Sequence, residues 1–156
     1  MYITELINPA RIRHTQGVSS KKRVLEQLSR LFSESTTNLT QGKVFDSLIE
    51  RERLGSTGFG KGVAIPHSRI QGLQQPLAAF IKLDHGIDFD ALDNEPVDLL
   101  FALLVPEDST EEHLQLLAQL AQMVSEPDLC SQLRAIDDQS SLYELLQHWE
   151  HENISA

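Results

Sequence analysis

Cysteine is almost absent from this sequence, and its scarcity narrows the class of protein. Cys130 is the single cysteine among 156 residues, so no disulfide can form within the chain. It lies between Leu129 and Leu133 in a helical pattern, where a lone cysteine is usually a small buried apolar residue. No residue that could activate a thiol lies beside it in the sequence. We therefore expect a reducing compartment and predict the cytoplasm.

Long apolar runs and a leader pattern are also missing. The longest apolar stretches, near residues 77–81 and 99–105, are far shorter than the roughly 20 residues that a membrane-spanning helix needs. Residues 1–10 lack the order of basic and then apolar residues that marks a signal peptide. We predict no insertion into a membrane.

Basic residues are outnumbered. The chain has 13 Lys and Arg against 23 Asp and Glu, which gives a formal net charge of −10. An acidic surface repels the phosphate backbone of nucleic acids, so we predict no nucleic-acid partner. Partners with a basic face would be favoured. An acidity that only maintains solubility is an equally good interpretation.

What is present indicates one folded α/β domain over residues 1–156. Hydrophobic residues make up 40% and charged residues 23%, as in folded soluble proteins. Apolar residues recur at helical spacing after Ser20 and after Thr40, and again after Ser109, Pro127 and Ser141. Residues 77–83 and 97–105 between these groups read as strands. The second strand is nearly all apolar, which predicts burial on both faces in the middle of a sheet.

Four of the eight glycines gather in residues 55–62, directly before the short apolar run that ends at Pro66 and His67. Glycine lets backbone approach a ligand closely, and successive N–H groups in such a loop can hold an anion. The loop matches neither a Walker loop nor a dinucleotide-binding fingerprint. An ordinary turn or hairpin therefore remains the alternative.

Histidine is the residue type that could carry chemistry beside this loop. A neutral imidazole nitrogen is a good nucleophile near pH 7, so His67 could accept a phosphoryl group. A second histidine nearby would disfavour charge on the first and could hydrogen-bond the attached group. His113, at the start of the helix after Ser109, is one candidate, although a capping or half-buried role is as common. His148 and His151 have the spacing of a metal pair near the C-terminus, and we predict no metal site there.

Arginine supplies the candidate anion-binding side chains. Arg51 and Arg53 could hold a phosphate by a bidentate fork. They alternate with Glu50 and Glu52, so a solvent-exposed helix face is the alternative interpretation.

Two blocks of sequence resemble one known family. The first joins residues 51–58 (RERLGSTG) to residues 60–67 (GKGVAIPH), and the second joins residues 98–106 (DLLFALLVP) to residues 112–114 (EHL). In this order they resemble the mannitol/fructose-class enzyme IIA domains of the bacterial phosphotransferase system. The resemblance covers about residues 6–149. Residues 20–23 (SKKR), the Gly-Ser-Thr-Gly loop and the apolar strand make it most similar to the standalone, nitrogen regulatory type.

The resemblance implies a fold and a site. The fold would be a small mixed β-sheet sandwiched between helices. His67 would be the phosphorylated residue, His113 would stabilise the phosphoryl group, and Arg51 would lie at the rim of the site. Thr57, Gly60 and Gly62 would belong to the loop that binds the phosphoryl group or the partner. No metal or cofactor is implied.

The resemblance also implies a function. An HPr- or NPr-type phosphocarrier would dock a basic face on an acidic rim and phosphorylate His67. The phosphorylation state would then regulate target proteins, including potassium transport or sensor-kinase proteins. A sugar-specific IIA that passes phosphate to a IIB protein is the nearest alternative, and a non-catalytic binding module of the same fold is another. A metal hydrolase is weaker, since no third ligand is placed. Ser68 and Arg69 stand where many relatives have Gly-Lys or Gly-Thr, which bears on the partner surface.

Overall fold

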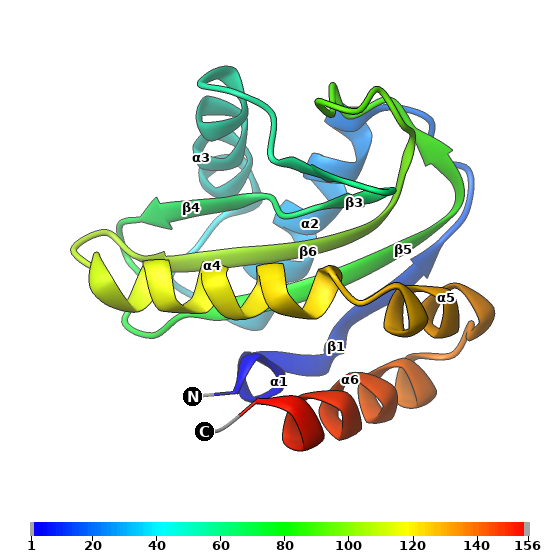
Figure 1. The fold of residues 1–156 in the computed structure, drawn as a ribbon. Coiled ribbons are helices and arrows are strands. Elements are labelled where there is room, and N and C mark those ends of the chain that lie inside the picture. Colours follow the sequence, from blue (N-terminus) through cyan, green and yellow to red (C-terminus); the bar gives the residue numbers. More distant parts are fainter. Residues whose placement is uncertain (1, 155–156) are drawn as a thin grey trace.

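A six-stranded mixed sheet runs through the middle of the computed structural model, which describes residues 2–154 (Figure 1). The central strand β6 is antiparallel to β5 and parallel to β3 and β4, which follow one another along its other edge. In spatial order the strands are β1 (Ile7–Thr15), β5 (Leu77–Ile87), β6 (Val97–Pro106), β3 (Val63–Ala64) and β2 (Gly58–Gly60), and β4 (His67–Ile70) pairs with β6.

Helices cover both faces of this sheet, as Figure 1 shows, and the expected fold class is confirmed. One face carries α2 (Lys21–Ser35) and α3 (Gln41–Arg53). The other carries α1 (Ile3–Leu6), α4 (Glu111–Val124), α5 (Pro127–Ala135) and α6 (Gln139–Asn153). Within residues 2–154, no helix combines the length and the apolar character that crossing a membrane requires.

Strand β6 links the two apolar layers, which confirms that it is buried on both faces. Leu99, Phe101 and Leu103 pack toward α4, α5 and α6, whereas Leu100 and Ala102 pack toward α2 and α3. All five are at most 1% exposed. Burying each large apolar side chain of this kind stabilises the fold by about 1.5–3 kcal/mol. The tightly packed sheet therefore holds the residues at its edges in fixed positions.

Only some of the helices begin at the capping residues that the sequence predicts. The Ser20 and Thr40 hydroxyls accept hydrogen bonds from the N–H groups three residues later, at 3.2 Å in each case, and confirm the predicted starts of α2 and α3. The predicted start at Ser141 is wrong by several residues. Helix α6 begins at Gln139, because the Asp138 carboxylate accepts the Ser141 N–H at 2.9 Å.

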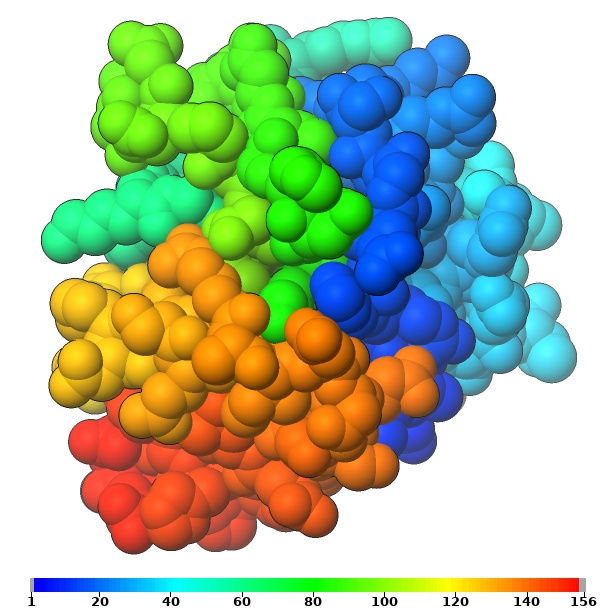
Figure 2. Space-filling view, turned by 90° about the vertical axis from the view of Figure 1, so that its right-hand side faces the viewer, coloured from blue at the N-terminus to red at the C-terminus, as the bar shows by residue number. Residues whose placement is uncertain are grey.

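The two ends of the described chain lie side by side. The buried Glu150 carboxylate of α6 accepts the N–H groups of Ile3 and Thr4, at 2.5 and 2.9 Å, and the Thr4 hydroxyl at 2.7 Å. The space-filling view shows the orange part of the C-terminal region against the blue N-terminal segment (Figure 2). Residues 150–153 belong to helix α6, and residues 155–156 lie outside the described part.

Candidate functional site

His67 is the first residue of β4, at a break in the edge that pairs with β6. Strand β3 ends at Ala64, and β4 resumes the pairing with His67 opposite Leu103. Between them Pro66 has no N–H to donate, but its carbonyl accepts the Leu103 N–H at 2.9 Å. The backbone on either side of the break is thus anchored to the central strand, and His67 is presented from a rigid edge.

The His67 ring has a defined tautomer. Its Nδ1 atom lies 2.8 Å from the carbonyl oxygen of Ile65, and because a carbonyl only accepts, Nδ1 carries the proton. The Nε2 atom then has its lone pair free. Burial of the ring lowers the pKa of His67 below its ordinary value, helped by the charge of Arg51 and opposed by the Ile65 contact and by Glu52. The ring is therefore neutral, and nucleophilic at Nε2, at pH 7.

His113 is the second imidazole of the site, from the first turn of α4. Its ring centroid lies 5.4 Å from that of His67, with 62° between the ring planes. Burial lowers the pKa of His113, and the nearby charges of His67, Arg69 and Arg51 lower it further. Within the described residues, Nε2 of His113 is a buried polar atom without a hydrogen-bonding partner. The two histidines are thus close together and both neutral. Nε2 of His113 can form one further hydrogen bond.

A cavity of about 530 Å³ opens on one side of the histidine pair. Its wall carries three arginines, Arg51, Arg53 and Arg69, and a single carboxylate, that of Glu50. The expected acidic rim is therefore wrong for this wall: the acidity of the chain lies elsewhere, and the cavity beside His67 is basic. Anions are the ligands that such a wall favours.

A second cavity, of about 360 Å³, opens on the other side. Arg51 and His67 line both cavities, so they form the partition between them. The second cavity is more apolar, with Phe59 and Leu117 in its wall beside Thr57. Arg51 is held in place by donating from Nη1 to the Gly55 carbonyl at 2.9 Å.

Gly60 and Gly62 line neither cavity, and their expected role in phosphoryl or partner binding stays a prediction. The N–H of Lys61 between them donates to the Asp93 carboxylate at 2.8 Å, so it is not directed at His67. Gly62 has a φ of +83°, and a Cβ there would lie 2.7 Å from Nη2 of Arg134. A turn and close packing explain these glycines.

Two further residues, Ser68 and Glu52, were not recognised as part of the site in the sequence analysis. Ser68 is buried beside His67, and its hydroxyl is paired with that of Ser47 from α3. Glu52, interpreted as part of an exposed helix face, is buried. Its spacing offered a signal, because Val44, Leu48 and Glu52 recur every four residues on the buried side of α3.

Fold and site together define a class: a small α/β domain that presents a neutral histidine, paired with a second one, beside a basic cavity. Among residues 2–154 no three His, Cys, Asp or Glu side chains gather as metal ligands. The arrangement suits nucleophilic attack by Nε2 of His67 on an anionic electrophile.

Comparison with known proteins assigns the family. Residues 5–149 match the family described as "Phosphoenolpyruvate-dependent sugar phosphotransferase system, EIIA 2". The "Nitrogen regulatory protein" of Pseudomonas aeruginosa is 46% identical over 144 residues, which are 92% of this chain and 94% of that protein. The chain belongs to this family of phosphotransferase system IIA proteins, and nitrogen regulatory proteins are among its relatives.

Solved structures agree. The crystal structure of nitrogen regulatory protein IIA-Ntr from Neisseria meningitidis superposes with a TM-score of 0.86 at 41% identity, covering 92% of this chain and 98% of that one. IIA mannitol from Escherichia coli, at 16% identity, shares the fold with a TM-score of 0.74 over 89% of this chain and 97% of that one.

Proposed function

We propose that this chain is a regulatory phosphocarrier, in which Nε2 of His67 accepts a phosphoryl group from the phosphohistidine of an HPr- or NPr-type carrier. The observation that carries this proposal is the 2.8 Å contact between Nδ1 of His67 and the Ile65 carbonyl, because it leaves Nε2 free and unprotonated. The lowered pKa of His67 supports it, since a protonated ring could not attack.

The transfer step balances within the two proteins. Nε2 of His67 attacks phosphorus in line with the carrier's P–N bond; that bond breaks, and its electron pair returns to the carrier's imidazole. His67 keeps the proton on Nδ1, and the Ile65 carbonyl stabilises the positive charge that the ring gains. The step requires no metal and no cofactor.

His113, Arg51 and Arg69 are the groups that we assign to the phosphoryl oxygens. The unpartnered Nε2 of His113 is suited to a hydrogen bond with one of them. The negative charge of the attached group would favour a protonated His113, which would strengthen that bond. The arginines on the cavity wall would neutralise the remaining charge.

The carrier and the targets would dock around the same site. Three large apolar side chains are exposed on residues that border it: Leu54 (85%), Leu114 (69%) and Phe59 (47%). Apolar side chains next to basic ones are typical of an interface with an apolar centre and a charged rim. A phosphoryl group in the middle of that surface would alter the binding of any partner that covers it.

The regulatory part of the proposal is supported by the names of the relatives, which are nitrogen regulatory proteins. As targets we propose proteins of potassium transport and sensor kinases. We place the function in the cytoplasm, where a single unpaired thiol such as Cys130 is the normal state.

Intact-mass spectrometry tests the proposal. The chain is incubated with phosphoenolpyruvate and the general phosphotransferase proteins, of the sugar or of the nitrogen type. We expect one acid-labile phosphoryl group on the wild type and none on His67→Ala. His85→Ala is the matched control, because the His85 side chain is 88% exposed and outside both cavities. No phosphorylation with either donor set would contradict the proposal.

A further inference from the structure

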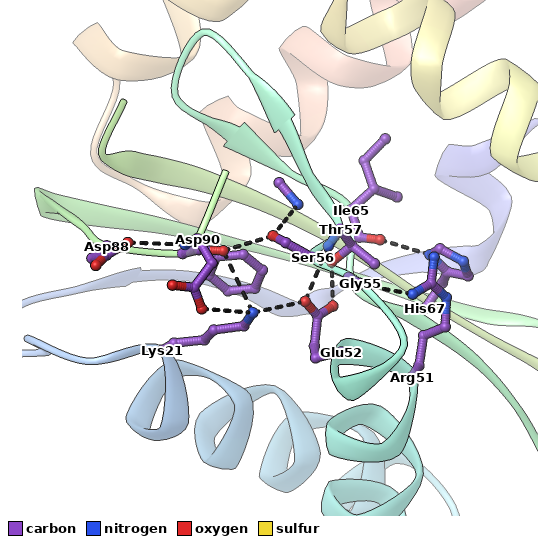
Figure 3. A network of polar contacts seen from close by, with 12 residues as sticks. Lys21, Arg51, Glu52, Gly55, Ser56, Thr57, Ile65, His67, Asp88 and Asp90 are labelled. Carbon is purple, nitrogen blue, oxygen red and sulfur yellow. Dashed lines mark hydrogen bonds and ion pairs between the residues drawn. The ribbon is translucent and has the colours of Figure 1, made fainter. Parts of the chain in front are cut away.

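Glu52 is a carboxylate in an unusual place for a residue in the last turn of a surface helix. Its side chain is 3% exposed, and each oxygen has a partner. Oε1 accepts the Thr57 N–H at 3.0 Å and lies 3.0 Å from Nζ of Lys21, and Oε2 accepts the Thr57 hydroxyl (Figure 3). A buried carboxylate with partners on both oxygens fixes the geometry of the groups around it.

The contacts continue from Thr57 to His67. The Thr57 carbonyl accepts the Ile65 N–H at 2.9 Å, and the Ile65 carbonyl is the group that accepts from Nδ1 of His67. Glu52 is thus connected to the His67 ring through the backbone of two residues, Thr57 and Ile65. The Thr57 hydroxyl faces Glu52, so Thr57 contributes to the site through its backbone.

Lys21 holds the other side of Glu52. Its ammonium lies 3.5 Å from the Asp90 carboxylate and 3.4 Å from the Phe89 carbonyl, which accepts from it, and 4.6 Å from the centre of the Phe89 ring. The first residue of α2 therefore connects the last turn of α3 with the loop after β5 (Figure 3). Three separate segments thus anchor the network.

We infer that Glu52, held by Lys21, is a positioning residue for phosphoryl transfer: it fixes Thr57 and thereby the Ile65 carbonyl that sets the tautomer and the direction of His67. The inference rests on the proposed function for the reaction, but the state of the ring can be observed without it. Outer partners that orient a reacting histidine act in this way, and small displacements of a nucleophile are costly because in-line attack requires alignment.

Two variants remove the network from opposite ends. Glu52→Gln removes the carboxylate charge, and Lys21→Met removes the ammonium while leaving the bonds from Thr57 to Glu52. Asp46→Asn and Lys22→Met are the matched controls, because both residues are exposed neighbours on the same two helices and line neither cavity. Circular dichroism shows which variants are folded.

Two measurements are made on each folded variant: the rate of phosphorylation at a saturating concentration of phosphorylated carrier, and the ¹⁵N spectrum of the His67 ring in the free protein. For Glu52→Gln we expect the rate to fall roughly 10- to 100-fold. We expect its spectrum to change from a single Nδ1–H tautomer to a mixture. Lys21→Met should lower the rate and mix the ring tautomers in the same way, but to a smaller extent. The two control variants should match the wild type in rate and in spectrum.

The outcomes separate the two proposals. If the wild-type protein accepts no phosphoryl group, the proposed function is contradicted. The ring spectra then still test whether Glu52 determines the tautomer of His67. If wild type accepts the group, and the variants keep its rate or lose rate with an unchanged ring spectrum, the positioning role is overturned. Should Glu52→Gln fail to fold, Lys21→Met carries the same test.

Discussion

Nδ1 of His67 lies 2.8 Å from the carbonyl oxygen of Ile65, two residues earlier in the chain, and this contact leaves Nε2 as the ring nitrogen with a free lone pair. The contact depends on the break at Pro66 between β3 and β4, which turns the ring back toward its own backbone. A regular strand would direct residues 65 and 67 to the same face without such a bond. The local irregularity is thus what prepares the nucleophile.

The pH dependence of phosphorylation follows from the burial of His67. Burial and Arg51 lower the pKa of the ring, so the neutral, reactive form persists as the pH falls through the ordinary histidine value of about 6.5. We expect the midpoint of the decline in rate to lie below that value. Phosphorylation assays quenched at fixed times measure the rate. An NMR titration of the His67 ring in the free protein shows whether the decline follows the pKa of His67 rather than a property of the carrier. A midpoint at or above the ordinary value contradicts the prediction.

His113 should matter more for the rate than for the site of phosphorylation. Replacing His113 by Ala removes a hydrogen-bond donor to the phosphoryl group while His67 keeps its contact with Ile65. We expect His113→Ala to be phosphorylated on His67 about 100-fold more slowly than the wild type. Quench-flow kinetics with mass analysis measures this, and an unchanged rate would remove His113 from the mechanism.

Phosphorylation should also change the protonation of His113. In the free protein the pKa of His113 is lowered by burial and then by the charges of His67, Arg69 and Arg51. An attached phosphoryl group is negative and stabilises the protonated form, so the pKa of His113 should rise on phosphorylation. An NMR titration of both forms measures the direction. A pKa that stays constant or falls would show that the phosphoryl group does not face this ring.

Glu150 should be a determinant of stability with no effect on transfer. Replacing it by Ala leaves the N–H groups of Ile3 and Thr4 buried without an acceptor, which costs about 3 kcal/mol. Urea unfolding measures this loss, and Glu144→Ala, an exposed change on the same helix, is the control. If both variants unfold at the same urea concentration, the hydrogen bonds at the chain ends contribute little.

Alanine substitutions at two glycines should change the stability of the protein in opposite directions. Gly62→Ala places a Cβ 2.7 Å from Nη2 of Arg134 at a φ of +83°, and should destabilise the protein by about 1–3 kcal/mol. Gly42→Ala meets no atom within 4 Å on helix α3 and should stabilise it by about 0.5 kcal/mol. Thermal unfolding of both variants measures the two shifts, and equal shifts of the same sign contradict the account.

Elements with a strong local signal were predictable, and elements defined by a neighbouring strand were not. Helix α2 and helix α3 combine a capping residue with a long apolar stripe, so Ser20 and Thr40 identified their starts. Strand β1 was missed because residues 7–15 (INPARIRHT) carry no alternation, and its strand form comes from pairing with β5. The short β2 and β4 likewise depend on β3 and β6.

The site was predictable at the level of residue types. The paired blocks around His67 and His113 carried the resemblance, and the structure brings the two rings together. Glu52 was not recognised as a buried residue, because its alternation with Arg51 and Arg53 is also the pattern of an exposed face. Its four-residue spacing from Leu48 and Val44 was the signal that pointed the other way. The sign of the charge near His67 was wrong for a similar reason: net charge is a sum over the whole chain, whereas a cavity wall depends on three or four side chains.

The junction of Tyr2 and His151, whose rings stack 4.2 Å apart, has a consequence for how such a domain can be combined with others. Both ends of the described chain, residues 2–154, lie at one edge of the fold (Figure 1). A domain with adjacent ends can be inserted into a loop of a host protein, or circularly permuted with a short linker, without pulling its core apart. The architecture is thus suited to exchange as a cassette, with His67 carried on β4, which pairs with β6.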